Sequence, residues 1–172
     1  LVTGTTVTLT ADATGADSVG TVANAINTTA GTLAAVAGTG GIFVDETDAL
    51  IIGGTGVQTT GASGDISITL GSGNLTLNED ITAAGSGSVT LALNGAGGAL
   101  ETDSAGDDIA STSGAITITA DTLTLGTGTI STSGALVLQP LTTTRDMVLG
   151  AAGAASDMAL DDTELGLLTN GF

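Results

Sequence analysis

The sequence predicts an all-β protein, a parallel β-helix (β-solenoid) in which short strands stack coil upon coil. A five-residue phrase recurs: a glycine, a free position, then two aliphatic residues separated by one other residue. Aliphatic residues at i and i+2 of a strand point to the same face, so each phrase predicts a short strand with one buried side. The phrase returns at irregular spacings of about one to two dozen residues, which favours a stack of similar coils. Its copies begin at Gly64, Gly73, Gly87, Gly114 and Gly134.

The N-terminal part has a less regular pattern. Val7 and Leu9 alternate with threonines, which predicts a strand over 2–10. Residues 11–27 are expected to form a loop or irregular coil, because the threonines and Gly31 that follow would stop any helical turn at once. Further strands are expected at 32–35, 40–44 and 49–52.

Strand patterns are almost continuous between Gly64 and Pro140. They cover 65–70, 74–77, 80–83, 88–93, 99–102, 108–111, 115–120, 122–125, 129–132 and 135–139. Three strand patterns lie between Gly114 and Gly134, which suits a three-sided coil. Coils of about 20 residues would give roughly eight or nine coils and a rod about 40 Å long. Aliphatic residues are expected inside, with Thr and Ser forming polar ladders outside.

The C-terminal tail has a different pattern. A short helix is expected at about 162–168. Asp161 or Asp162 can accept hydrogen bonds from its first N–H groups, and Glu164 stands where a capping-box acid would lie opposite Asp161.

The composition excludes several kinds of chemistry and partner. Arg145 is the one basic residue against 18 acidic residues, so the formal net charge of −17 repels nucleic acids and anionic membranes. The chain has no Cys, His, Trp or Tyr, which removes thiol and imidazole nucleophiles, histidine-bearing zinc and haem sites, and disulfides. No run of eighteen apolar residues is present, so we expect no membrane insertion.

Acidic clusters are the remaining candidates for a site. Calcium takes six to eight oxygen ligands at 2.3–2.6 Å, and carboxylates on turns can supply them. The candidate ligands are Asp45, Glu46, Asp48, Glu101, Asp103, Asp107 and Asp108. None of these clusters has EF-hand spacing, so the favoured interpretation is that turn acids start and stop strands and keep an apolar rod soluble. Calcium stays an alternative, and we expect no other cofactor.

Some β-helices degrade polysaccharides, so adjacent acids such as Asp107 with Asp108, or Asp161 with Asp162, are candidates for a hydrolase centre. Adjacent residues on a strand point to opposite faces, and the chain lacks Trp and Tyr to stack on sugar rings. We therefore predict that the protein is not an enzyme. Arg145 is expected to be a structural partner for Asp146 or another nearby carboxylate.

Three parts of the chain together resemble a module of giant repetitive bacterial surface proteins of the filamentous haemagglutinin type. The first comprises Thr28–Ala35, Gly40–Asp45 and Leu50–Gly53, and the second is the tract of strand phrases. The third and most specific comprises Leu138–Leu141, Arg145–Asp146, Leu149–Gly150 and Met158–Leu165, and it looks like the stretch that closes one repeat before the next begins. The resemblance implies a right-handed parallel β-helix exported to the bacterial surface, without catalytic residues.

These observations give a set of expectations about function. We expect residues 1–172 to form one solenoid module, a fragment or repeat of a longer chain, because there is no initiator Met and neither end looks capped. The expected role is a structural repeat of an extracellular fibre or giant adhesin, with neighbouring copies or adjacent repeats joined end to end. The alternative is an adhesin module that binds a glycan or another surface, and a polysaccharide-degrading enzyme ranks below both.

Overall fold

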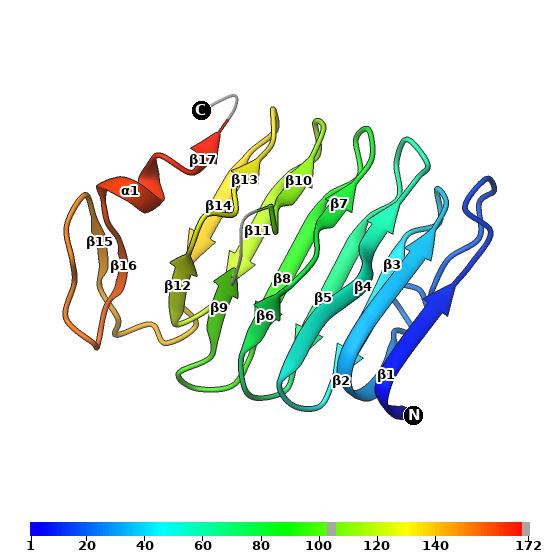
Figure 1. Ribbon diagram of the computed structural model, residues 1–172, viewed down its shortest axis with the longest axis horizontal. Coiled ribbons are helices and arrows are strands. Elements are labelled where there is room, and N and C mark those ends of the chain that lie inside the picture. The colour runs from blue at the N-terminus through cyan, green and yellow to red at the C-terminus, as the bar shows by residue number, and fades with distance from the viewer. Residues whose placement is uncertain (103–105, 170–172) are drawn as a thin grey trace.

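The computed structural model describes residues 1–102 and 106–169, and it confirms the predicted fold class. The chain is a β-solenoid of about six turns, built almost wholly of parallel strands with one short helix near the C-terminus. Figure 1 shows strands of successive coils lying side by side along the long axis, with the N-terminus at one end. The helix is too short to cross a membrane, and no other helix occurs in the described ranges.

The structure contains seventeen strands and one helix within those ranges. They are β1 (Val2–Thr10), β2 (Ile26–Ala37), β3 (Ile42–Glu46), β4 (Leu50–Thr59), β5 (Ile66–Leu70), β6 (Leu75–Leu77), β7 (Ile81–Ala83), β8 (Val89–Leu93), β9 (Ala99–Thr102), β10 (Ile109–Ser111), β11 (Ile116–Thr119), β12 (Thr122–Leu125), β13 (Ile130–Ser131), β14 (Leu136–Gln139), β15 (Met147–Leu149), β16 (Met158–Leu160), α1 (Asp162–Leu165) and β17 (Leu168–Thr169). Most predicted strands are present, shortened by a residue or two at their ends.

The strands form three columns, one for each side of the coil. The first column runs β3–β5–β8–β11–β14. The second runs from the start of β4 through β6 and β9 to β12, and the third from the end of β4 through β7, β10 and β13 to β17. At the N-terminal end, β1 pairs with β2, which pairs in turn with β3 and β4.

Register aligns the aliphatic residues of successive coils into a shared interior. In the first column, Ile66, Val89 and Ile116 are each paired with the next and are fully buried. In the second column, Leu75 pairs with Leu100, and both are fully buried. Side chains at the intervening positions, mostly Thr and Ser, point outward, as the period-2 pattern predicted.

Coil length is the part of the prediction that was wrong. The expected length fits the coil that leads from Ile116 to its partner Leu136. The coils before it are longer, because Val89 pairs with Ile116 and Ile81 pairs with Ile109. The chain therefore completes about six coils where eight or nine were expected. The turns between strands are longer than the strand pattern suggested, and part of the C-terminal tail leaves the stack.

The glycines that lead the repeated phrases are required mainly for packing. Gly64, Gly87, Gly114 and Gly134 form a column in which each approaches the carbonyl oxygen of the glycine one coil earlier. A Cβ added at Gly87 or Gly114 would lie 2.1 Å from that oxygen, and none of the four has a positive φ. Among the glycines that lead the phrases, only Gly73 has a positive φ, of +80°, a conformation that favours glycine.

The N-terminal half contains more strand than expected. β2 begins at Ile26, within the stretch assigned to a loop, and β4 continues to Thr59 through several glycines. Gly54 and Gly56 have positive φ values of +68° and +74°, and the register between β2 and β4 shifts beside them. β4 bends at this irregularity. Its first part therefore pairs with β6 in the second column, and its last part pairs with β7 in the third.

The two ends of the rod differ, although the sequence suggested that neither is capped. At the N-terminal end, β1 pairs with no other described strand than β2. At the C-terminal end, the β15–β16 pair and α1 lie against the stack, and Met158 and Leu160 are fully buried in its core. The predicted capping box is present at α1, with Asp161 as N-cap, but the helix ends at Leu165 rather than at 168.

Candidate functional site

Several acidic side chains tie one coil to the next. Asp80 accepts a hydrogen bond at Oδ1 from the backbone N–H of Asp108, at 2.9 Å. Asp108 accepts in turn from the N–H and the hydroxyl of Thr129, at 2.7 and 2.8 Å. Asp65 accepts from the N–H of Ser88 in the same way, at 2.8 Å. Each carboxylate stands just before a strand, so Asp108, a calcium candidate, serves to hold the turn of the following coil.

Glu46, a second calcium candidate, lies inside the solenoid. It ends β3 on the same side as Ile42 and Val44, and only 2% of its surface is exposed. Its carboxylate accepts hydrogen bonds from the Thr28 hydroxyl at 2.7 Å and from the N–H groups of Ala30 and Thr47 at 3.0 and 2.8 Å. These three donors compensate the cost of burying the carboxylate. In return, the carboxylate gives the buried polar groups at this corner of the coil an acceptor.

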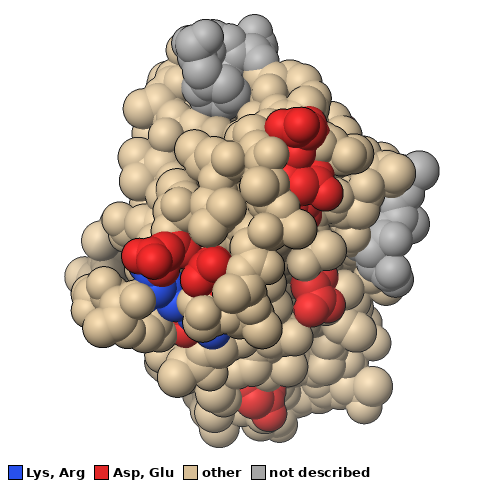
Figure 2. Space-filling view, turned by 90° about the vertical axis from the view of Figure 1, so that its left-hand side faces the viewer, with Lys and Arg blue, Asp and Glu red and all other residues tan. Residues whose placement is uncertain are grey.

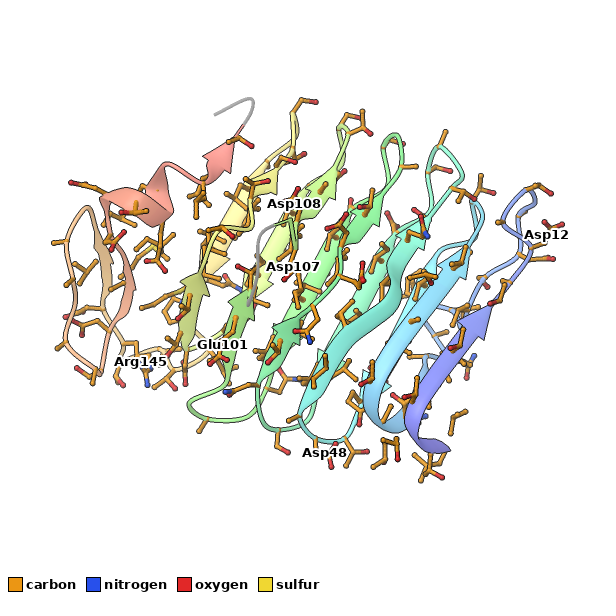
Figure 3. The ribbon with its side chains drawn as sticks, viewed as in Figure 1. Asp12, Asp48, Glu101, Asp107, Asp108 and Arg145 are labelled. Atoms are coloured by element: carbon orange, nitrogen blue, oxygen red, sulfur yellow. The ribbon has the colours of Figure 1, made fainter. Side chains whose placement is uncertain are left out.

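The structure does not bring the calcium candidates together. Asp45 and Asp48 are exposed, Asp107 is buried, and Glu101 is half-buried with Oε1 3.4 Å from the Asn74 amide. Asp103 lies outside the described residues. Figure 3 shows the labelled acids spread over the rod, with Asp48 at a turn and Asp12 near the N-terminal end. Within 1–102 and 106–169, no three acidic side chains are close enough to hold a metal ion.

The acid pairs considered for a hydrolase centre have structural contacts. Asp108 is tied to Thr129, and Asp161 caps α1 by accepting from the N–H groups of Thr163 and Glu164. Glu164 closes the capping box by accepting from the N–H of Asp161 at 3.1 Å. Its other oxygen accepts from the N–H of Leu125, at 3.0 Å, so the same side chain fastens the helix to the end of β12.

Arg145 pairs with Asp121, a residue that sequence reasoning did not single out. The distance from Arg145 Nε to Asp121 Oδ1 is 3.6 Å, and the Asp121 side chain is 1% exposed. The expected partner was Asp146 or a nearby carboxylate, and the partner found lies in the preceding coil. Figure 2, which looks at the C-terminal end of the rod, shows this single basic side chain with acidic side chains next to it.

Asp121 stays ionised although it is buried. Burial raises the pKa of its carboxyl, but the Thr142 hydroxyl, the N–H groups of Gly97 and Thr142, and the Arg145 charge together hold that pKa below its usual value of 3.8. The bonds from Thr142 measure 2.7 Å each and the bond from Gly97 measures 2.8 Å. Asp121 therefore joins the β8–β9 turn and the C-terminal tail through one carboxylate.

A hollow on the surface lies on the outer side of the first column. Residues 20–25 form a tight turn, closed by reciprocal hydrogen bonds between Thr21 and Asn24, that overhangs β3. Phe43 points outward from β3, yet it is only 8% exposed because this turn lies beside it. The resulting groove has a volume of about 390 Å³, and its outer wall is made of polar side chains. They include Asp45, Asp65, Ser67, Thr69, Ser88 and Thr90.

Sequence reasoning did not find this groove. One signal was available: Phe43 occupies an outward position between Ile42 and Val44, where the next three strands of the column have Ser67, Thr90 and Thr117. An aromatic residue at an outward position indicates that something covers it. Comparison with protein-family models, with curated proteins and with solved structures found no match to this chain.

Proposed function

We propose that this chain is a structural module of an extracellular bacterial fibre or giant surface protein, in which it serves as a stiff rod. The observation that carries the proposal is the continuous aliphatic interior, which runs from Val7 in β1 to Leu160 in β16 as one cluster. Each coil buries its own aliphatic residues only against its neighbours, so stability and shape both come from stacking.

Ties between coils support stiffness as the functional property of the rod. Backbone ladders run down all three columns, and side-chain bonds from Asp65, Asp80, Asp108 and Asp121 add a second connection at the turns. Bending the rod would have to open a ladder on one side and compress the glycine column on another. Among the acidic residues considered for chemistry, Asp108 is used in these ties, Glu46 accepts hydrogen bonds inside the coil and Asp161 caps α1, which is why we propose no catalytic role for them.

Two tandem copies of the chain provide a test of the rod. Joined in sequence, they should scatter X-rays in solution as one rod, with the cross-section of a single copy and twice its length. Two bodies that move independently about the junction would contradict the proposal. Antibodies against the chain should also label intact cells of the source organism, and labelling that requires permeabilised cells would contradict the extracellular location.

The groove beneath residues 20–25 favours a second candidate function, binding of a glycan. Its wall offers hydroxyl groups and the exposed carboxylate of Asp45, and Phe43 adds an apolar side chain to the lining. This combination is suited to a neutral sugar. Asp45 and Asp48 form a matched pair, because both are exposed on the same coil and only Asp45 lines the groove.

A glycan array with three proteins separates this candidate from a passive rod. The unmodified chain should bind a subset of neutral glycans, Asp45→Asn should reduce that binding about tenfold or more, and Asp48→Asn should leave it unchanged. No binding by the unmodified chain, or equal loss in both variants, would reject the groove as a glycan site and leave the rod proposal standing.

A further inference from the structure

The turn between β8 and β9 contains an asparagine followed by a glycine, Asn94 and Gly95. Within 1–102 and 106–169 this dipeptide occurs once, and the sequence contains it again outside those ranges, at Asn170 and Gly171. Asparagine is one of the thermolabile residues of proteins, because the nitrogen of the following residue can attack its side-chain amide. Glycine at the following position leaves that nitrogen without a neighbouring Cβ, so the approach is unhindered.

The structure leaves both reacting groups of this dipeptide free. The Asn94 side chain is exposed, and neither its amide nor the N–H of Gly95 is hydrogen-bonded to another group in the described part of the chain. Other groups hold the turn: the N–H of Asn94 donates to the carbonyl of Leu70, and the N–H of Gly98 donates to the carbonyl of Gly95, both at 2.9 Å. The Gly95 nitrogen and Cγ of Asn94 therefore remain available for a reaction.

The other four asparagines of the described ranges lack this combination. Asn24, Asn27, Asn74 and Asn78 are followed by Ala, Thr, Leu and Glu respectively, so each attacking nitrogen would have a side chain beside it. Asn27 lies within β2, and the Asn74 side chain accepts a hydrogen bond from the N–H of Ala99 at 3.1 Å.

Asn78 is the best matched control for Asn94. Both residues are exposed and directly follow a strand, β6 for Asn78 and β8 for Asn94. The N–H of Asn78 donates to the carbonyl of Ile52 at 2.9 Å, as the N–H of Asn94 donates to a carbonyl of the preceding coil. The two sites therefore differ mainly in the residue that follows the asparagine.

We propose that Asn94 is a site of spontaneous covalent modification in the folded rod, where it is converted through a succinimide into aspartate and isoaspartate. The Gly95 nitrogen forms a bond to Cγ of Asn94, the bond from Cγ to the amide nitrogen breaks, and ammonia leaves with the proton that the Gly95 N–H gives up. Water then opens the succinimide ring. Its attack at Cγ gives aspartate, and its attack at the main-chain carbonyl carbon of Asn94 gives isoaspartate, in which the main chain runs through the former side chain.

Isoaspartate does not suit this turn, because it lengthens the main chain by a methylene group. A Cβ added at Gly95 would lie 2.7 Å from Cα of Ser72, so the preceding coil leaves no room for further atoms there. Two residues along the chain, the N–H of Gly97 donates at 2.8 Å to Asp121, the buried carboxylate that joins this turn to the C-terminal tail. Isoaspartate should therefore displace the turn and weaken that link, whereas aspartate keeps the normal backbone and adds a charge at an exposed position.

Peptide mapping by mass spectrometry tests the site. During incubation of the folded chain in mildly alkaline buffer, the peptide with Asn94 should gain the mass difference between an oxygen atom and an NH group. It should do so about tenfold faster than the peptide with Asn78, which corresponds to a barrier about 1.4 kcal/mol lower. Asn94→Gln should prevent the change at this position, because the longer side chain forms the corresponding ring much more slowly.

Three outcomes of the mapping would overturn the proposal. The first is an Asn94 that is converted in the urea-denatured chain but stays intact in the folded chain, because the fold would then protect it. The second is conversion of Asn94 no faster than that of Asn78. The third is a product that contains aspartate alone, without any isoaspartate that an isoaspartate-specific methyltransferase can label, because the succinimide route gives both.

A second measurement tests the effect of isoaspartate on the turn. After chromatographic separation, hydrogen exchange at the Gly97 N–H should be about tenfold faster in the isoaspartate form than in Asn94→Asp, which has the same charge on a normal backbone. Exchange in β5 should be the same in both proteins. Equal exchange at Gly97 would reject the weakened link to Asp121. The inference goes beyond the proposed function, and none of these results bears on the tandem rod measurement.

Discussion

The carbonyl oxygen of Gly64 occupies the place where Gly87, one coil later, would have its Cβ. The separation would be 2.1 Å, which no real Cβ contact allows. The same relationship joins Gly87 to Gly114, so the spacing between coils at this corner depends on the absence of a side chain.

Gly87→Ala should therefore destabilise the protein. We expect a loss of about 1–3 kcal/mol in the free energy of unfolding, measured with urea, because the backbone of the preceding coil at Gly64 must shift to admit the methyl group. Gly4→Ala is the matched control: the nearest atom to its added Cβ is 3.4 Å away, an ordinary contact. A Gly87→Ala protein as stable as the control would show that the column relaxes freely.

Glu46→Leu should destabilise the protein although it would continue an aliphatic column. Glu46 pairs with Leu70, and Leu70 with Leu93, so leucine suits the shape. The change leaves the Thr28 hydroxyl and the N–H groups of Ala30 and Thr47 without their acceptor. We expect a loss of about 3 kcal/mol or more in urea unfolding.

Leu70→Met is the control for repacking at the same corner and should cost about 1 kcal/mol or less. If Glu46→Leu were no worse than this control, the buried carboxylate would not be required.

Asp121→Asn should show a stability difference that depends on pH. The folded-state pKa of Asp121 lies below its usual value of 3.8, so the ionised carboxylate stabilises the fold above that pH. This stabilisation is lost as the pH falls through the folded-state pKa. We expect Asp121→Asn to lower the free energy of unfolding by about 2 kcal/mol at neutral pH. The NH2 group of asparagine cannot accept a hydrogen bond, so it would replace one of the two oxygens to which Gly97 and Thr142 donate.

The measurement compares thermal unfolding of the two proteins from neutral pH down to about pH 3. The difference between them should shrink below about pH 4, whatever happens to the stability of each. A difference that stays constant over this range would mean that the charge of Asp121 is unimportant.

Glu164→Ala should loosen the C-terminal tail without unfolding the coils. The change removes the bond to Leu125 and one half of the capping box, and caps of this kind contribute about 1 kcal/mol. Hydrogen exchange should accelerate in α1 and β16 about fivefold, while β5 and β8 keep their protection. Glu79→Ala, an exposed glutamate, is the control, and equal acceleration in both variants would contradict the role of Glu164.

Calcium should leave the melting temperature unchanged. Among the residues that the structure describes, no three acidic side chains lie close enough together to bind a metal ion. Glu46 and Asp108 already accept hydrogen bonds from neighbouring residues. Melting in millimolar calcium and in chelator should therefore coincide. A rise with calcium would indicate a site that ligand binding stabilises, and Asp45→Asn and Asp48→Asn would then locate it.

Much of the fold could be predicted because its signals are local. Alternation of aliphatic and polar residues predicted β5, β8 and β11 nearly to their ends, and the spacing of Asp161 and Glu164 predicted the capping box. Partners one coil apart could not be predicted. Asp121 finds Arg145 and Glu46 finds Thr28 only because the intervening turns have particular lengths.

Local patterns are enough to predict short strands with aliphatic side chains on one face, since a period of two residues acts within each strand. The recurrence of the glycine-led phrase predicts that these strands stack. The number of coils, the groove over Phe43 and the packing of β15, β16 and α1 against the stack emerge only in the folded chain. The physical reason is that contacts between coils depend on the total length of each coil, which varies with turns that no repeated pattern specifies.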